Sequence, residues 1–264
     1  MRQRVLVGFL AVVCVLACGN EQSDDSSSET KKIDVGRGFG DSVDGSNDGS
    51  TCDGTLTGRI RDFRMTFPDM EPAHSGKSDN SLDEGIVKAT IDPDSRKPIY
   101  AGGATGTVTT TGAANFDQWF RDVQDVNVGQ SLPLKFTGPD ANGVYSYDNQ
   151  AFFPIDGQLL GNEGQDHNYS FTFELHTVFQ YQGGETFTFT GDDDVFTFIN
   201  DQLVVNLGGV HNAMSRTINV DSLGLTKGKS YPLDFFFAER HVTESHFRID
   251  TSLQFIECGK IYLQ

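Results

Sequence analysis

The stretch Gly183–His211 constrains the fold more than any other part of this chain. It reads GGETFTFTGDDDVFTFINDQLVVNLGGVH, in which Phe alternates with Thr on both sides of the aspartate triplet Asp192–Asp194. Alternation of aromatic and β-branched residues predicts two half-buried strands, so the three carboxylates lie at the turn between them. Asn200 and Asp201 then predict a tight hairpin turn, because both residue types tolerate positive φ.

Three adjacent carboxylates repel one another unless a cation lies among them. Ca²⁺ takes six to eight oxygen ligands, and the triplet supplies the negative charge that such an ion requires. Further oxygens could come from the loop 239–245, which links two predicted strands and carries Glu239 and Glu244. The alternative is a solvated acidic turn whose carboxylates accept hydrogen bonds from nearby backbone N–H groups.

The remainder of the segment 51–264 also predicts strands, and it is long enough to bury a sizeable core. The chain contains 21 Phe and 29 Gly, a composition that favours strands and turns. Many short strands without regular alternation with helices predict an all-β, antiparallel β-sandwich. The predicted strands are Thr55–Phe63, Tyr169–Leu175, Glu185–Thr190, Val195–Ile199, Leu203–Leu207, Thr217–Val220, Tyr231–Ala238 and Phe247–Phe255.

One short helix and several long loops complete the predicted fold. Asn115 can cap the helix, with Gln118 three residues later, and apolar residues then recur at helical spacing. We expect this stripe to pack in the core; it comprises Phe116, Trp119, Phe120 and Val123. The Gly- and Pro-rich segment from Asp125 to Asn168 predicts long loops.

The first fifty residues predict an exported and anchored protein. Two arginines precede an apolar run, Val5–Ala17, that is too short to span a bilayer, which is the pattern of a signal peptide over 1–17. The run ends in Val15-Leu16-Ala17-Cys18, which resembles a bacterial lipobox, with a plain signal peptide as the alternative. The resemblance implies lipidation of Cys18 and a place in the bacterial cell envelope, at the outer membrane or the cell surface. Residues 18–50 are poor in apolar side chains and predict a disordered tether.

Two cysteines remain once the signal peptide is removed and Cys18 carries lipid. They are Cys52, just after the tether, and Cys258, close to the end of the chain. Because an exported compartment permits disulfides, we expect a bridge that joins the two ends of the folded domain. A loop of this length would contribute about 4–5 kcal/mol in the chain-entropy model. The alternative is two free thiols.

Four motifs, in chain order, resemble the fibro-slime domain family. They are FDQWFRDV at 116–123, FFPIDG at 152–157, GDDDVFTFINDQLVVNLGGVH at 191–211 and FFFAERHVTESHFRIDTSL at 235–253. The resemblance covers nearly all of 51–258. That family is in turn similar to the protective-antigen-type β-sandwich of toxins, glycosidases and yeast flocculins. The resemblance therefore implies a protective-antigen-like β-sandwich for the domain 51–264.

The flocculin pattern implies which residues hold metal and ligand. In flocculins, two adjacent aspartates joined by a cis peptide hold calcium, and the calcium holds a sugar's hydroxyl groups. Here the pair falls on Asp192 and Asp193, while Asp194 stands in place of a glycine and Asn200 in place of a later aspartate. The subdomain that sets sugar specificity in flocculins is not recognisable in this chain. The expected metal ligands are Asp192, Asp193, Asp194 and Glu239, and the expected ligand-binding residues are Asn200, His211, Arg240, His241 and Glu244.

Other chemistries have weaker support. Glu174, Glu185 and Glu239 offer carboxylates, but nothing in their spacing requires a glycosidase pair. His241 and His246 lack the further ligand of a zinc site, and His211 is expected to hold loop backbone. A net charge of −17 argues against nucleic-acid binding.

The sequence therefore predicts a non-enzymatic surface module. Its partners are an extracellular glycan or glycoprotein, bound through calcium during adhesion or slime association, and the membrane through the lipid anchor. The alternative function is a structural matrix component that associates with copies of itself without specific glycan binding.

Overall fold

The computed structural model describes residues 52–70 and 82–262. The predicted signal peptide, the lipidation site Cys18 and the tether 18–50 lie outside these residues. Within them the fold is an all-β antiparallel sandwich with one short α-helix, as predicted. In the same part of the chain, no helix is long and apolar enough to cross a membrane.

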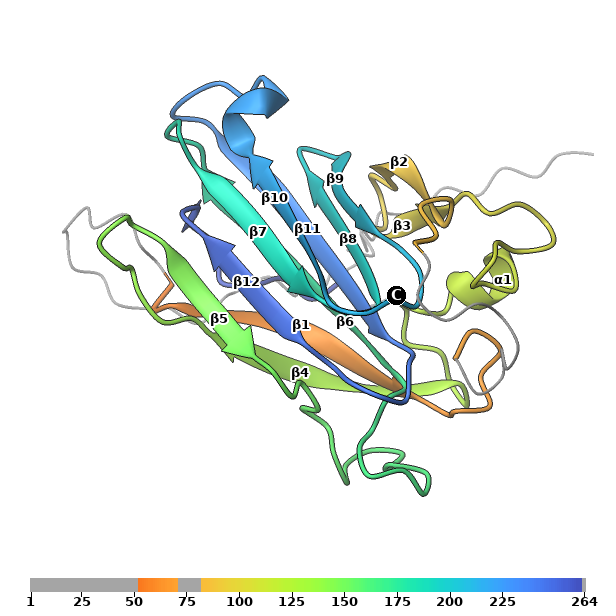
Figure 1. Cartoon of the computed structure of the whole chain (residues 1–264). Helices are drawn as coiled ribbons and strands as arrows, with labels where there is room; N and C mark the ends of the chain where they lie inside the picture. The colour runs from red at the N-terminus through yellow and green to blue at the C-terminus, as the bar shows by residue number, and fades with distance from the viewer. Residues whose placement is uncertain (1–51, 71–81, 263–264) are drawn as a thin grey trace, which may run out of the picture. The chain divides into compact units, whose positions relative to one another are not determined.

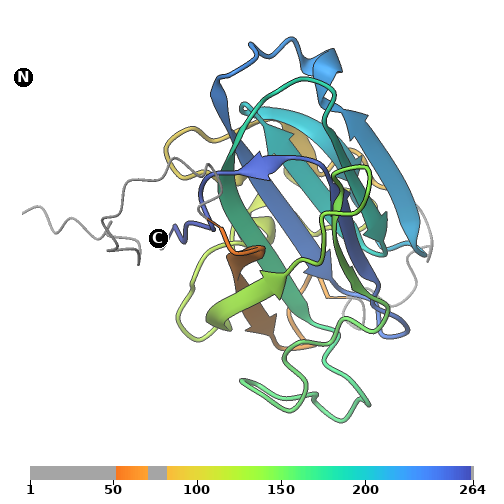
Figure 2. The same ribbon diagram turned by 90° about the vertical axis from the view of Figure 1, so that its left-hand side faces the viewer.

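The sandwich consists of a large and a small antiparallel sheet. Figure 1 shows the small sheet in front of the large one, and Figure 2 shows the same layers turned by 90°. The large sheet has the order β3 (Pro98–Tyr100), β2 (Val87–Ile91), β9 (Gln202–Leu207), β8 (Asp194–Ile199), β11 (Ser230–Glu239), β6 (Phe171–Gln180), β1 (Thr55–Phe63) and β4 (Asn127–Lys135), with β13 (Gln254–Phe255) paired to β6. The small sheet has the order β10 (Met214–Asn219), β7 (Thr186–Gly191), β12 (Phe247–Thr251) and β5 (Tyr145–Asn149).

Aromatic rings fill the space between the two sheets. Phe247 of β12 lies at the centre of this core, with its ring centroid 5.5 Å from that of Phe235 and 5.2 Å from that of Phe237. Phe152 stacks on it at 4.5 Å, and Phe189 of β7 lies 5.4 Å away. Rings of this size bury a large apolar area and therefore contribute much of the stability of the sandwich.

A second apolar cluster covers the outer face of the large sheet. It contains Phe236 of β11, Phe196 of β8 and Trp119, which lies just after the helix α1 (Ala113–Phe116). Figure 1 shows α1 beside the strands β2 and β3. Because β11 is covered on both faces, it is buried from Leu233 to Glu239, and its sequence there contains three consecutive Phe rather than alternating apolar and polar residues.

The structure contains a strand at every predicted position and adds four further strands. However, β6 runs five residues beyond its predicted end, and the predicted strand Phe247–Phe255 divides into β12 and β13, which belong to different sheets. The strands β4 and β5 fall within the predicted loops between Asp125 and Asn168, so that prediction was wrong in part. The strand β4 contains Gly129 and Pro133, which argued against a strand, yet it pairs with β1 over nine residues. It tolerates the proline because it is an edge strand, which needs hydrogen bonds on one side only.

The helix lies close to its predicted position but has a different N-terminus. It begins at Ala113, and its N-cap Gly112 makes no side-chain capping bond. Asn115 lies inside the helix and donates from Nδ2 to Thr111 Oγ1 at 2.7 Å. Phe116, Trp119 and Phe120 are buried, as predicted, whereas Val123, which was also expected in the core, is only half-buried.

The disulfide Cys52–Cys258 is present, as predicted. It spans 206 residues with a Cα–Cα distance of 5.3 Å. Beside it, the backbone N–H of Thr57 donates to the carbonyl oxygen of Cys258 at 2.8 Å. The bridge therefore joins the start of β1 to the last part of the described chain, and it fits an extracellular protein.

Candidate metal and ligand site

The aspartate triplet occupies the crossing from β7 in the small sheet to β8 in the large sheet. Asp192, Asp193 and Asp194 are 4%, 1% and 0% exposed, so the turn is buried rather than solvated. Gly191 precedes it, and a Cβ at that position would lie 2.2 Å from the carbonyl oxygen of His246. Only glycine therefore allows the loop 240–246 to pack this closely against the triplet.

Asp194 forms a buried ion pair with Arg240. Its Oδ2 accepts from Nε of Arg240 at 2.6 Å, and its Oδ1 accepts from the backbone N–H of Gly209 at 2.7 Å. Nη1 of Arg240 donates to the carbonyl oxygens of Asp69 and Thr109, each at 2.8 Å. This pair joins the two strands β8 and β11 to outer segments of the fold and neutralises the charge of Asp194.

Asp193 turns the chain and accepts two backbone hydrogen bonds. Its φ of 54° lies in the left-handed region. The cis peptide expected between Asp192 and Asp193 is not found; among the described residues the cis peptide lies at Gly138–Pro139. Oδ1 accepts from the N–H of His211 at 3.2 Å and Oδ2 from the N–H of Arg240 at 2.8 Å. Burial raises the pKa of Asp193 well above its usual value, neighbouring carboxylates add to the rise, and the charge of Arg240 opposes it.

Glu239, the last residue of β11, is fully buried beside the triplet. Its Oε1 accepts from the N–H of His241 at 3.1 Å. The Ser245 hydroxyl approaches it, but within the described chain neither Ser245 Oγ nor Glu239 Oε2 forms a hydrogen bond of acceptable geometry. Burial raises the pKa of Glu239 well above its usual value, and the charges of Asp193 and Asp192 raise it further.

Asp192 links this buried acid pair to the surface. Its Oδ1 accepts from the N–H of His246 at 2.7 Å, and its Oδ2 lies 2.6 Å from Nδ1 of that ring. Glu244 is exposed, and its Oε2 lies 3.9 Å from the same Nδ1. One ligand atom from each of Asp192, Glu244 and His246 falls within 4.8 Å of the others, a spacing that a metal ion could bridge.

The structure places Asp192, Asp193 and Glu239 near enough for their charges to interact. Among the described residues, however, the acids and histidines whose ligand atoms lie within 4.8 Å of one another are Asp192, Glu244 and His246, not the predicted set of metal ligands. Asp192, Asp193 and Glu239 form the acid cluster, a term we keep for these three residues. Asp194 faces Arg240 instead. The sequence reasoning set His246 aside because it found no zinc pattern, although the residue lies two positions after Glu244 and immediately before β12.

The predicted ligand-binding residues are less closely grouped. Asn200 lies at the far end of β8 in the hairpin turn, where its φ is 49°. A six-residue strand spans about 20 Å, so Asn200 does not reach the acid cluster. Arg240 is buried and paired with Asp194. His241 forms a hydrogen bond between its Nδ1 and Thr243 Oγ1 at 2.7 Å. His211 holds loop backbone, with ring nitrogens 2.9 and 3.2 Å from the carbonyl oxygens of Asn212 and Leu207.

The remaining glutamates considered for a catalytic pair have separate partners. Glu174 lies in a buried ion cluster with Arg61 and Lys97. Glu185 accepts hydrogen bonds from the backbone N–H groups of Gln182 and Gly183 and so stabilises its own turn.

Comparison with known proteins identifies a domain and homologues. Residues 155–262 match the PA14 domain. The chain is 39% identical over 211 residues to Protein psiR of Dictyostelium discoideum, which covers 73% of this chain and 21% of psiR. It is 40% identical over 189 residues to Protein psiD of the same organism, which covers 67% of this chain and 37% of psiD. The chain thus spans well under half the length of these relatives.

Solved structures with PA14 domains give weaker likenesses. The PA14 sugar-binding domain from an RTX adhesin is 14% identical with a TM-score of 0.28, over 44% of this chain and 76% of that one. The PA14 domain of the MpAFP antifreeze protein is 13% identical with a TM-score of 0.27, over 78% of this chain and 85% of that one.

Proposed function

We propose that this chain is a non-enzymatic surface module that binds carbohydrate through a calcium ion held by the acid cluster. The observation that carries the proposal is Glu239 Oε2, a buried carboxylate oxygen without a hydrogen-bond partner in the described chain, beside two further acids. A buried carboxylate is costly unless it is protonated, paired or bound to a metal. The match of residues 155–262 to the PA14 domain supports a binding module.

The charge balance of the site supports a divalent cation. Arg240 is the cation beside Asp193, and its charge is already paired with Asp194. The acid cluster therefore carries an excess of negative charge, which adds to the effect of burial in raising the pKa values of Asp193 and Glu239. A dication would offset this excess charge.

The donor set favours calcium among the dications. Asp192, Asp193 and Glu239 offer oxygen ligands, which hard cations prefer. Glu244, which is exposed, offers a further carboxylate at the solvent side of Asp192. These residues would hold the ion, and because they supply only part of the six to eight oxygens that calcium takes, sugar hydroxyl groups could complete its shell.

The disulfide and the motif that ends at Cys18 support a location outside the cell, on a membrane. The disulfide supports an oxidising, extracellular compartment. We propose a lipid anchor at Cys18, in the envelope of a bacterium, on the basis of the lipobox-like motif in the first 18 residues. Cys18→Ser should release the protein from the membrane fraction, because a lipidated cysteine is the only strong anchor that the proposal contains.

The test measures calcium and glycan binding separately. We expect isothermal titration to show calcium binding by the wild type, and Asp193→Asn and Glu239→Gln to weaken it at least tenfold. Glu84→Gln is the matched control, because Glu84 is an exposed acid outside the acid cluster. A glycan array with the same four proteins should then show binding that EDTA abolishes.

Each outcome points to one function. Absence of calcium heat in the wild type would contradict the metal site. Calcium binding without any glycan signal, together with concentration-dependent assembly, would favour the self-associating matrix component. Turnover of a polysaccharide would contradict a non-enzymatic role.

A further inference from the structure

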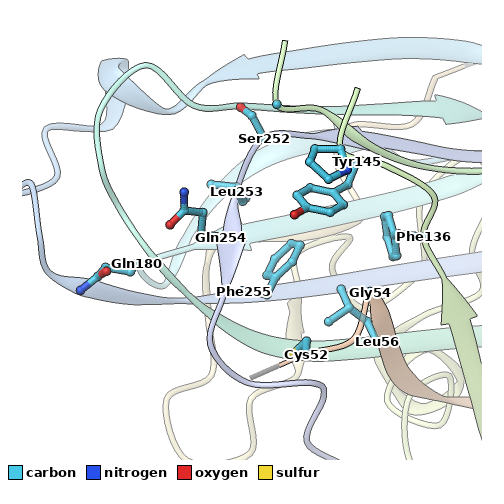
Figure 3. Close-up of a pocket in the computed structure, with 12 residues that line it drawn as sticks. Cys52, Gly54, Leu56, Phe136, Tyr145, Gln180, Ser252, Leu253, Gln254 and Phe255 are labelled. Atoms are coloured by element: carbon cyan, nitrogen blue, oxygen red, sulfur yellow. The ribbon is translucent and has the colours of Figure 1, made fainter. Parts of the chain in front are cut away.

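A second candidate site lies at the opposite end of the sandwich from the acid cluster. The strand β12 runs between them: His246, just before it, contacts Asp192, whereas Ser252, just after it, lines a cavity of about 400 Å³. Figure 3 shows this cavity, which is also bordered by the start of β1 and by β13. The two sites therefore do not share residues.

The described residues that line the cavity are uncharged, although 22% of the chain is charged. None of them is Asp, Glu, Lys, Arg or His; they are Cys52, Gly54, Leu56, Phe136, Pro139, Gly143, Tyr145, Gln180, Ser252, Leu253, Gln254 and Phe255. A charged ligand would lose its hydration here without gaining an ion pair. The lining therefore selects for a neutral ligand.

Three aromatic rings provide the apolar part of the cavity. Figure 3 shows the rings of Phe136, Tyr145 and Phe255 around it, with the side chains of Gln254 and Gln180 on the side away from Phe136. Phe136 is almost buried, whereas Tyr145 and Phe255 are half-buried. The ring faces offer an apolar surface against which the C–H groups of a ligand can pack.

The polar part of the cavity consists of groups that both donate and accept. Within the described chain, the Tyr145 hydroxyl and the Gln254 amide have no side-chain hydrogen-bond partner, and the Ser252 hydroxyl accepts from the N–H of Thr186 at 3.0 Å while its own hydrogen is available. Hydroxyl and amide groups can each donate and accept. They therefore suit a ligand whose polar groups also do both, which is the property of sugar hydroxyls.

The geometry points to a second, metal-independent binding site for a neutral saccharide in this cavity. The volume lies within the range of small-ligand pockets, which are lined mainly by apolar and aromatic side chains with a few polar groups. Sugar C–H faces pack on Tyr145 and Phe255, and sugar hydroxyls bond to Gln254 and Tyr145. A neutral peptide is the competing occupant, because its N–H and C=O groups could also pair with these side chains, and the experiment therefore includes one.

The experiment titrates the labelled protein in EDTA and follows it by NMR. The probes are methyl α-D-glucopyranoside, methyl α-D-mannopyranoside, methyl β-D-galactopyranoside, maltose and cellobiose, with the neutral capped peptide acetyl-Ser-Phe-Gly-amide as a comparison. We expect at least one sugar to cause saturable shifts of the Gln254 amide and the Tyr145 ring. Gln254→Ala and Tyr145→Phe should each weaken that binding roughly threefold to tenfold, since each removes one hydrogen-bonding group.

Two controls separate this site from the acid cluster and from general surface effects. Gln202→Ala removes an exposed glutamine in β9, away from the cavity, and should leave binding unchanged. Asp193→Asn should also leave it unchanged, so failure of the calcium proposal would not affect this one. The inference is overturned if no sugar gives saturable shifts at these residues in EDTA, if Gln254→Ala and Tyr145→Phe bind as the wild type does, or if only the peptide binds.

Discussion

Two buried glutamates, Glu174 in β6 and Glu239 in β11, show the same side chain in opposite electrostatic settings. Glu174 accepts from Arg61 Nη2 at 2.8 Å and from Lys97 Nζ at 2.5 Å, and it lies 3.3 Å from His176 Nε2. Burial would raise the pKa of Glu174, but His176, Arg61 and Lys97 outweigh burial and lower it to about 2. Glu239 has one backbone donor and acidic neighbours, and its pKa rises.

The comparison distinguishes a buried carboxylate that is neutralised by cations of the fold from one whose neighbours are acidic. The Glu174 cluster is balanced and extends through His176 to Asp234 at 2.7 Å, while Asp234 also pairs with Arg96. These contacts tie strands β6 and β11 to the turn between β2 and β3. The acid cluster is less well compensated: Asp192 contacts His246 and Asp193 accepts two backbone hydrogen bonds, but the nearby Arg240 is paired with Asp194.

The largest expected effect on stability appears when Glu174 and Glu239 are each replaced by glutamine in separate variants. Glu174→Gln should lower the free energy of unfolding by about 3–5 kcal/mol, because it leaves Lys97 buried without its carboxylate and removes one of the two acids paired with Arg61. Glu239→Gln should change it by less than about 1 kcal/mol without calcium, because burial and the acidic neighbours of Glu239 already disfavour its charged form. Urea denaturation in EDTA measures both variants. Equal losses would show that the two clusters do not differ in kind.

A smaller effect should separate two neighbouring aspartates. Asp194→Asn should cost about 2–3 kcal/mol of stability, because it removes the charge paired with Arg240. Asp193→Asn should cost less in stability but should weaken calcium binding. Thermal unfolding with and without calcium distinguishes them. If Asp194→Asn weakened calcium more than Asp193→Asn did, the ligand assignment would be wrong.

The pH dependence of stability should have opposite signs at the two clusters. The pKa of Glu174 is lowered, so its contribution is present above its ordinary pKa of 4.5 and is lost as pH falls toward about 2. The pKa of Glu239 is raised, so the metal-free protein should lose stability as pH rises from about 4.5 through the folded-state pKa. Unfolding free energies of the wild type and Glu239→Gln, measured across pH in EDTA, test this. Parallel curves would contradict the raised pKa.

The smallest expected effect tests whether burial, rather than pairing alone, gives the Glu174 cluster its importance. Arg248 pairs with Asp250 at 2.6 Å and with Asp148 at 2.8 Å, but all three side chains are partly exposed. Arg248→Ala should therefore cost no more than about 1 kcal/mol by urea denaturation. A loss as large as that of Glu174→Gln would show that burial is not the deciding factor.

The sequence correctly predicted the elements that depend on patterns of neighbouring residues. Alternation of Phe and Thr located β7 and β8, and Asn200-Asp201 correctly located the hairpin turn, with φ angles of 49° and 66°. The partner of each aspartate depended instead on distant pairing. Asp194 lies opposite Ala238 in the register of β8 with β11, and this register brings Arg240 to it from 46 residues away. No local pattern carries that information.

Errors in the predicted site have the same origin. Asn200 was grouped with the triplet because it stands in place of a later aspartate in the flocculin pattern, but an extended strand separates the two. The cavity at the other end was not predicted, because its rings come from Phe136 and Tyr145 and from Phe255, which lies more than a hundred residues later in the sequence.

The bridge between Cys52 and Cys258 turns nearly the whole described chain into a covalent ring. A protease that cuts one loop within this ring opens it but releases neither piece, because both remain attached through the sulfur atoms. Two cuts are needed before any segment can leave. A protein that works among extracellular proteases would therefore keep its binding sites joined to its N-terminal segment after a first cleavage, for as long as the bridge stays oxidised.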